Sequence, residues 1–164
     1  MLSYKNEPLA KYASFRTGGN GDLVLFPQNQ DELVSALREH KDAIVLGNAS
    51  NTLITDKGIR GTVIFTTEIK EISINKNEIT AASGASLSAL AAFAAKNLLS
   101  GLEFLYGIPG TVGGAIYMNA GAYGGEIGNF IKEVRIFSPE HGIITLNRSE
   151  MNFGYRQSIL QEKK

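Results

Sequence analysis

The stretch "GLEFLYGIPGTVGGAIYMNAGAYGGE", residues 101–126, combines eight glycines with large apolar side chains. A flexible linker would be polar as well as glycine-rich, and a core helix would not carry so many residues that weaken helices. Glycines spaced in this way let the backbone come within van der Waals reach of a flat or charged ligand, and Ile108, Val112 and Ile116 can add apolar contacts. The segment therefore predicts a ligand-binding surface.

Two further features of the same segment support this interpretation. Pro109 stands before Gly110 and Thr111, an order that suits a turn leading into a helix amino terminus aimed at a phosphate. The alternative is a tight packing site between helices. Packing does not require so many glycines together with Asn119 and Tyr123, so the ligand-binding interpretation is favoured.

The composition is typical of a soluble globular protein. The chain has 164 residues, 43% hydrophobic and 20% charged, which suits one domain or two small halves. Its formal net charge of +0 provides no field for nucleic acid or an anionic membrane. The opening "MLSYKNEPLAKY" has no apolar signal region, and no run is long enough to span a bilayer, so a cytoplasmic location is expected.

Metal and nucleophile chemistry find no support in the sequence. The chain has no cysteine, and His40 and His141 have no ligand partners at metal-binding spacing, so both are expected to face solvent and no metal site is predicted. Ser14, Ser83 and Ser100 lack a strained elbow or a neighbouring base, which argues against nucleophilic catalysis.

The pattern of apolar residues predicts two halves. Residues 21–28, 29–40 and 42–51 have the character of a strand, a helix and a buried strand, which together form a βαβ unit. From residue 61 the runs become short and are separated by turn residues; "GTVIFTT" (61–67) is the first of these, and antiparallel hairpins are expected. The predicted class is α+β, with a βαβ subdomain at 1–65 and an antiparallel subdomain at 66–164 that contains a helix capped by Ser86 or Ser88.

A turn rich in small residues, "LGNASN" at 46–51, follows the second strand. Such residues allow consecutive backbone N–H groups to face an anion, and Ser50 and Asn51 add side-chain donors. The motif is neither a Walker loop nor a dinucleotide fingerprint. An ordinary turn remains the alternative.

The segment "FGYRQS" at 153–158 places Arg156 after Tyr155. A guanidinium can hold a carboxylate through two parallel hydrogen bonds and can stabilise an enolate. The alternative is a solvated surface charge.

Taken in order, four motifs resemble one family. They are "ASFRTGG" (13–19), "LGNASN" (46–51), "LSGLEFLYGIPGTVGGAIYMNAGAYGGEI" (99–127) and "FGYRQSI" (153–159). Together they are similar to the UDP-N-acetylenolpyruvoylglucosamine reductases, flavoproteins of bacterial peptidoglycan precursor synthesis. The resemblance covers essentially the whole chain, and its third motif is the most specific.

The resemblance implies an FAD-binding fold of the vanillyl-alcohol oxidase and p-cresol methylhydroxylase type, with FAD held by the βαβ and antiparallel subdomains. It implies that NADPH reduces FAD and that the enolpyruvyl group of a small-molecule UDP-sugar is then reduced. Arg156 matches the family arginine that stabilises the substrate enolate, with Tyr155 lining the site and Arg16 nearer the FAD or the substrate entrance. The residues implied in FAD binding are Leu46, Gly47, Asn48, Ala49, Ser50, Asn51, Gly107, Ile108, Pro109, Gly110, Thr111, Gly113, Gly114, Asn119, Gly121, Ala122 and Tyr123.

The chain departs from the family pattern in two places. Asn48 and Ala49 replace two glycines of the family turn; alanine tolerates a left-handed backbone poorly, so either an altered turn or weaker FAD binding is expected. The chain also ends at "SILQEKK", whereas the family continues with a substrate domain that carries a proton-donating serine and a glutamate. The expectation is therefore an incomplete amino-terminal part, which would act as an enzyme only with the remainder supplied in trans.

Two alternatives to the reductase interpretation remain. One is a non-catalytic FAD-binding or interaction module. The other is an oxidase of the wider flavin family, against which Arg156 argues because it suits an enolpyruvyl carboxylate.

Overall fold

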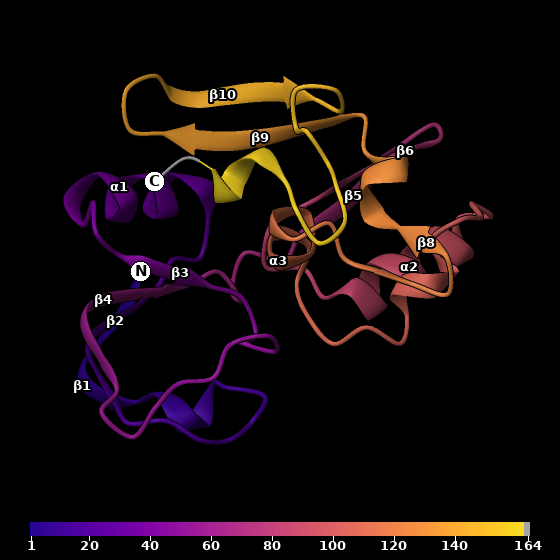
Figure 1. Cartoon of the computed structure of the whole chain (residues 1–164). Helices are drawn as coiled ribbons and strands as arrows, with labels where there is room; N and C mark the ends of the chain where they lie inside the picture. The colour runs from indigo at the N-terminus through magenta and orange to yellow at the C-terminus, as the bar shows by residue number, and fades with distance from the viewer. Residues whose placement is uncertain (163–164) are drawn as a thin grey trace. The chain divides into compact units, whose positions relative to one another are not determined.

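The computed structural model describes residues 1–162, which divide into two compact units, Met1–Lys70 and the part of the chain from Glu71 onward. Figure 1 shows the elements of both. The elements of the first unit are β1 (Leu2–Pro8), the 3₁₀ helix η1 (Leu9–Lys11), β2 (Asn20–Phe26), α1 (Gln30–Glu39), β3 (Ile44–Leu46) and β4 (Ile59–Phe65).

The first unit is built on a four-stranded mixed sheet in the order β1-β2-β4-β3. β1 is antiparallel to β2, whereas β4 is parallel to both β2 and β3. The predicted β2–α1–β3 crossover is present, but β4 lies between its two strands. The expectation that residues 61–67 form an antiparallel hairpin is wrong, because Val63, Ile64 and Phe65 are fully buried, as in a central parallel strand covered on both faces.

The two faces of this sheet have separate apolar clusters. Leu25 and Ile64 pack with Ala36 of α1 on one face, and Val24 and Phe65 belong to a cluster on the other face. The helix begins where the sequence predicts, since the Asn29 side chain accepts a hydrogen bond from the backbone N–H of Glu32 at 2.9 Å. β3, predicted to be buried, is a three-residue edge strand whose Ile44 and Val45 are about half exposed.

The second unit contains short strand pairs and helices around one core. Its elements are β5 (Ile72–Asn75), β6 (Glu78–Ala81), α2 (Leu87–Lys96), η2 (Glu103–Leu105), α3 (Val112–Tyr117), β7 (Gly121–Ala122), β8 (Gly125–Glu126), η3 (Ile127–Phe130), β9 (Glu133–Ser138), β10 (Gly142–Asn147) and η4 (Ile159–Gln161). In the described part of this unit the strands form the antiparallel pairs β5–β6, β7–β8 and β9–β10. The predicted antiparallel character is therefore confirmed for these segments.

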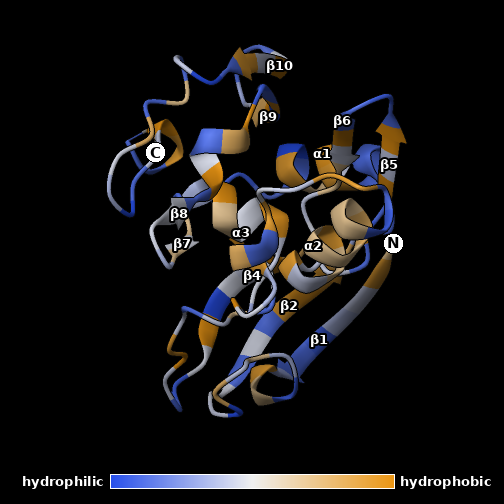
Figure 2. Cartoon of the chain, turned by 90° about the vertical axis from the view of Figure 1, so that its right-hand side faces the viewer, coloured by the Kyte–Doolittle hydropathy of each residue, from blue (hydrophilic) through white to orange (hydrophobic). Residues whose placement is uncertain are grey.

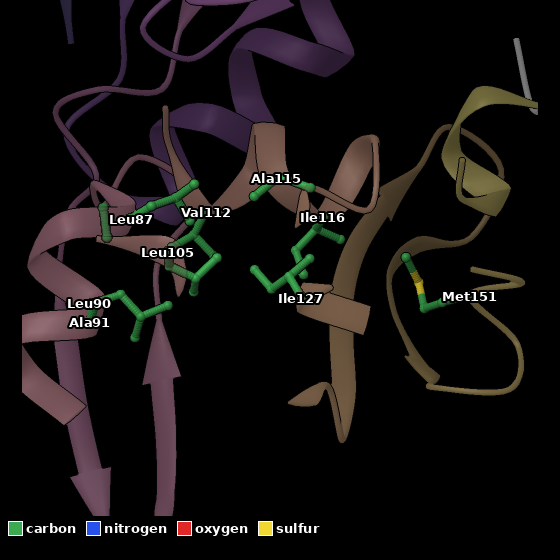
Figure 3. Packing of buried hydrophobic residues seen from close by; sticks show 11 residues of the cluster. Leu87, Leu90, Ala91, Leu105, Val112, Ala115, Ile116, Ile127 and Met151 are labelled. Atoms are coloured by element: carbon green, nitrogen blue, oxygen red, sulfur yellow. The ribbon is translucent and has the colours of Figure 1, made fainter. Parts of the chain in front are cut away.

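The core of the second unit joins α2, η2 and α3. Leu87, Leu105 and Val112 lie together in Figure 3, with Ile116 and Ile127 beside them. Figure 2 shows α2 coloured hydrophobic along most of its length, which follows from its run of Leu, Ala and Phe. Ser86 caps α2, as predicted, by accepting from the Ala89 N–H at 3.1 Å. Within residues 1–162, no helix has the length and apolar character needed to cross a membrane.

Candidate functional site

The turn at residues 46–51 follows β3 in the first unit and contains a left-handed alanine. Ala49 has φ +46° and is only 5% exposed, within the cluster that also contains Ala13. The left-handed conformation costs about 1–2 kcal/mol for an L-residue, and burial of the methyl group returns about 0.8 kcal/mol. Ala49 is thus held in a left-handed conformation, and the expected alteration of the turn stays a prediction.

The loop "ASFRTGG" lies against this turn. The Ser14 hydroxyl donates to the Asn48 carbonyl at 3.1 Å, which ties residues 13–19 to residues 46–51. Arg16, the predicted substrate contact, is exposed on this loop with φ +52°. The fold thus brings Arg16 into the neighbourhood of the predicted pyrophosphate turn within the first unit, while Ser14 is a residue that sequence reasoning did not assign to the site.

In the second unit, close packing or a positive φ within the chain explains most of the glycines in residues 101–126. A Cβ at Gly101 would lie 2.5 Å from the Phe130 ring, and one at Gly125 would lie 2.8 Å from the Phe104 ring. Gly113 lies against Ser83, Gly121 lies against Gly125 and Glu126, and Gly110 and Gly124 have positive φ. Packing, the alternative raised from the sequence, explains this part of the pattern.

Gly107 and Gly114 are not explained by packing or by a positive φ within residues 1–162. A Cβ on Gly107 would meet no atom of residues 1–162 within 4 Å, and one on Gly114 would meet only the Thr111 Oγ1, at 3.5 Å. Neither glycine has a positive φ, and both are exposed. Glycine destabilises a helix by about 0.5–1 kcal/mol relative to alanine. No contact within residues 1–162 requires glycine at position 114 of α3, so the fold does not explain this loss of helix stability. These two glycines are therefore the candidates within the segment for close approach of a ligand to the backbone.

The amide donors at the start of α3 bond within the protein, and its predicted role as a phosphate-binding helix terminus stays a prediction. The Val112 N–H donates to Ala85 O and the Gly113 N–H to Ser83 O, both at 2.8 Å, and the Gly114 N–H donates to the Thr111 Oγ1 at 3.4 Å. The first amide donors of this six-residue helix therefore bond within the protein. Sequence reasoning missed this because the acceptors lie about 30 residues upstream.

The β7–β8 hairpin carries an aromatic side chain at its tip. The two residues between its strands are Tyr123, with φ +52°, and Gly124, with φ +82°. A turn of this kind favours Asn or Gly at its first position, and a bulky residue there is strained. Tyr123 is 98% exposed, so no packing within the chain offsets this strain.

A second tight turn carries Arg156. Gly154 and Gln157 exchange backbone hydrogen bonds of 3.1 and 3.2 Å around Tyr155 and Arg156, and Arg156 has φ +55°. The Arg156 guanidinium lies 5.6 Å from the centroid of the Tyr155 ring and donates from Nη2 to Gly121 O at 2.9 Å. The fold therefore brings Arg156 and Tyr155 together and ties Arg156 to the glycine segment at Gly121. Two strained, exposed residues at neighbouring turns are typical of a functional site.

Asn119, which the family resemblance implies in FAD binding, has a buried side chain that bonds within the protein. It is 1% exposed, and its Nδ2 donates to Glu126 Oε2 at 3.0 Å and to Gly154 O at 2.8 Å. Its Oδ1 accepts the Gly128 N–H at 3.0 Å. Both amide hydrogens and the carbonyl oxygen are thus bonded within the protein. Glu126 and Gly154 belong to this network and carried no recognisable signal in the sequence.

The remaining predicted residues of the second unit occupy varied positions. Ile108 packs against the core, Pro109 is exposed, Thr111 is buried as the α3 cap, and Ala122 is half-buried in β7. Their contacts with a cofactor stay predictions. In residues 1–162 no group of three His, Asp or Glu side chains is arranged to hold a metal ion.

Comparisons with known proteins identify what the chain resembles. The model of a family described as FAD binding domain matches residues 21–147. The UDP-N-acetylenolpyruvoylglucosamine reductase of Caldanaerobacter subterraneus subsp. tengcongensis is 43% identical over 164 residues, which cover 98% of this chain and 54% of the relative. That of Levilactobacillus brevis is 46% identical over 162 residues, covering 96% of this chain and 53% of the relative.

Solved structures give the same result. The UDP-N-acetylenolpyruvylglucosamine reductase of Thermus caldophilus has a TM-score of 0.80 and 33% identity, over 96% of this chain and 56% of the other. An alkyldihydroxyacetonephosphate synthase (16% identity, TM-score 0.58) and the oxidoreductase GilR (12% identity, TM-score 0.64) share the fold alone. These findings confirm the predicted fold class and the family resemblance. The chain spans about half the length of the curated relatives it matches.

Proposed function

Because this chain belongs to the family of FAD binding domains, we propose that it is the FAD-binding part of a UDP-N-acetylenolpyruvoylglucosamine reductase. In this proposal NADPH is the reductant, and the substrate is the enolpyruvyl group of a UDP-sugar used for peptidoglycan precursors. These substrates imply a cytoplasmic location. Since the chain spans about half of its relatives, turnover requires the polypeptide that the relatives have in addition, supplied in the same protein or in trans.

The observation that carries the proposal is the pair Gly107 and Gly114. Both are exposed glycines whose missing Cβ atoms neither packing nor backbone conformation in residues 1–162 explains. They are the first and last residues of the "GIPGTVGG" segment, where the flat isoalloxazine ring of FAD fits the need for close backbone approach. FAD supplies the hydride-transfer chemistry when bound. Residues 46–51 would hold its pyrophosphate.

The chain's own residues contribute binding and charge. A guanidinium has five N–H donors, and the bond to Gly121 uses one of those on Arg156. The others suit the carboxylate of the enolpyruvyl group, whose charge increases as the enolate forms. A contact of this kind lowers a barrier by about 2–4 kcal/mol. Tyr155 supports the guanidinium through its ring face.

The substitution Gly114→Ala tests FAD binding. In the apoprotein the alanine should stabilise α3 by about 0.5–1 kcal/mol, measured by urea unfolding. The same methyl group should lower FAD affinity at least about tenfold, by analogy with overpacking of a filled site. Flavin absorbance after desalting and a fluorescence titration with FAD measure this affinity.

The matched control is Ala92→Gly on the exposed face of α2, which should lose stability and leave FAD affinity unchanged. Equal FAD affinity in wild type and in both Gly114→Ala and Gly107→Ala would remove these glycines from the flavin contact. A wild-type chain that retains no flavin would refute the proposal for this polypeptide.

The half-length coverage of the relatives favours one alternative, a non-catalytic FAD-binding module. Addition of NADPH to the flavin-loaded chain distinguishes the two. Bleaching of the flavin absorbance supports the reductase part, whereas stoichiometric FAD that NADPH does not reduce supports the module.

A further inference from the structure

Asn119 joins the nearby elements β8 and η3 to a turn that lies 35 residues further along the chain. Its side chain bonds to Glu126 in β8, to the Gly128 N–H in η3 and to Gly154 O at the base of the Arg156 turn, over distances of 2.8–3.0 Å. The side chain is buried and the backbone is left-handed, with φ +46°. Asparagine suits this position because it tolerates that conformation better than most residues.

The network reaches Arg156 from two sides. Gly154, which accepts from the Asn119 amide, closes the Arg156 turn with Gln157 through two backbone hydrogen bonds. Gly121, two residues after Asn119, accepts from the Arg156 guanidinium at 2.9 Å. One buried amide thus fixes the base of the turn that carries the arginine and the strand that receives its side chain.

We propose that Asn119 is a positioning residue that sets the direction of the Arg156 guanidinium. The inference rests on the proposed function for the meaning of that direction, since Arg156 is the group proposed to hold the substrate carboxylate. A direct cofactor contact through the Asn119 side chain is disfavoured, because an amide has two donor hydrogens and both are used by Glu126 and Gly154. A strained turn such as that of Arg156 persists only where its surroundings hold it in place.

Asn119→Asp is the sharpest test because it is isosteric. The carboxylate can still accept the Gly128 N–H and still tolerates the left-handed backbone, but it cannot donate to Gly154 O and it faces the Glu126 carboxylate. The ¹H–¹⁵N resonance of the Arg156 Nε–Hε group, assigned with Arg156→Lys, reports the order of the guanidinium. In the variant this resonance should move to the position of a solvated arginine, and the ring shift from Tyr155 should be lost.

A double variant separates positioning from folding. Asn119→Asp combined with Glu126→Gln removes the like-charge contact, so the second unit should keep the wild-type dispersion of its backbone amides while the Arg156 signature stays lost. The matched control is Asn152→Asp, the same chemical change at an exposed residue with φ +47°. It should leave the Arg156 resonance unchanged.

Retention of the wild-type Arg156 resonance in the folded double variant would overturn the inference. An FAD titration of the same samples tests the proposed function separately. If the wild type binds no flavin but the Arg156 signature depends on Asn119, the positioning role holds and the proposed function fails.

Discussion

Leu98 at the end of α2 is strained without any compensating contact. Asn97 is the C-cap, and the next two amides bond back to the helix: Leu98 N–H to Ala95 O and Leu99 N–H to Ala94 O, both at 3.0 Å. This is the Schellman arrangement, which favours glycine at the position that Leu98 occupies. Leu98 has φ +59° and is 94% exposed.

The substitution Leu98→Gly should therefore stabilise the protein. The left-handed conformation costs a leucine about 1–2 kcal/mol, which glycine does not incur. Glycine makes the unfolded chain more flexible, and this reduces the gain by about 0.5–1 kcal/mol. With 94% of the side chain in solvent, almost no apolar burial is lost. The expected net stabilisation is about 0.5–1 kcal/mol.

Urea unfolding of the full chain, followed by circular dichroism, measures the difference. The matched control is Ala95→Gly, in the last turn of the same helix and also exposed, where the backbone is ordinarily helical. That control should destabilise by about 0.5–1 kcal/mol. A Leu98→Gly variant that is no more stable than wild type would refute the reasoning that left-handed strain, rather than packing, dominates at this position.

Two further predictions concern titration and turnover. Burial raises the pKa of Tyr12 to about 12, and the hydrogen bond from Tyr12 to Glu7 adds to this shift. Because the raised pKa favours the protonated tyrosine in the folded state, it stabilises the fold. That stabilisation is fully present below about pH 10 and is lost as the pH rises through 12. Absorbance at 295 nm should show one tyrosine titrating near pH 12, absent in Tyr12→Phe; a wild-type curve identical to that of the variant contradicts the assignment. In a protein completed with the half that the relatives possess, Arg156→Ala should lower turnover about 10²–10³-fold and leave flavin content unchanged. Unchanged turnover would remove Arg156 from its proposed role.

Local features of the fold could be predicted from the sequence. The caps Asn29 and Ser86 act through backbone groups three residues away, so their effect is visible in a short window. The sequence predicts an antiparallel hairpin where β4 is a parallel strand, because the neighbours of a strand depend on pairing over long sequence distances. Its run of β-branched and aromatic residues suits both a hairpin and a central parallel strand.

In the candidate site, too, local features could be predicted from the sequence and long-range contacts could not. A glycine-rich apolar segment with an arginine after it could be recognised from residue types alone. The sequence could not tell which glycines serve packing, because the Phe130 ring against Gly101 comes from another element. Nor could it show that Asn119 bonds inward, since Gly154 is 35 residues away.

The central position of β4 has a consequence for synthesis on the ribosome. β1, β2 and α1 can form as they emerge, but within residues 1–162 β3 pairs only with β4, and β4 must enter between β2 and β3. At translation rates of about 5–20 residues per second, the stretch from Leu46 to Phe65 takes about 1–4 s. During that interval the nascent chain presents an open β2 edge and a Val24 side chain that still lacks its contacts from β4, which is the kind of surface that a chaperone protects.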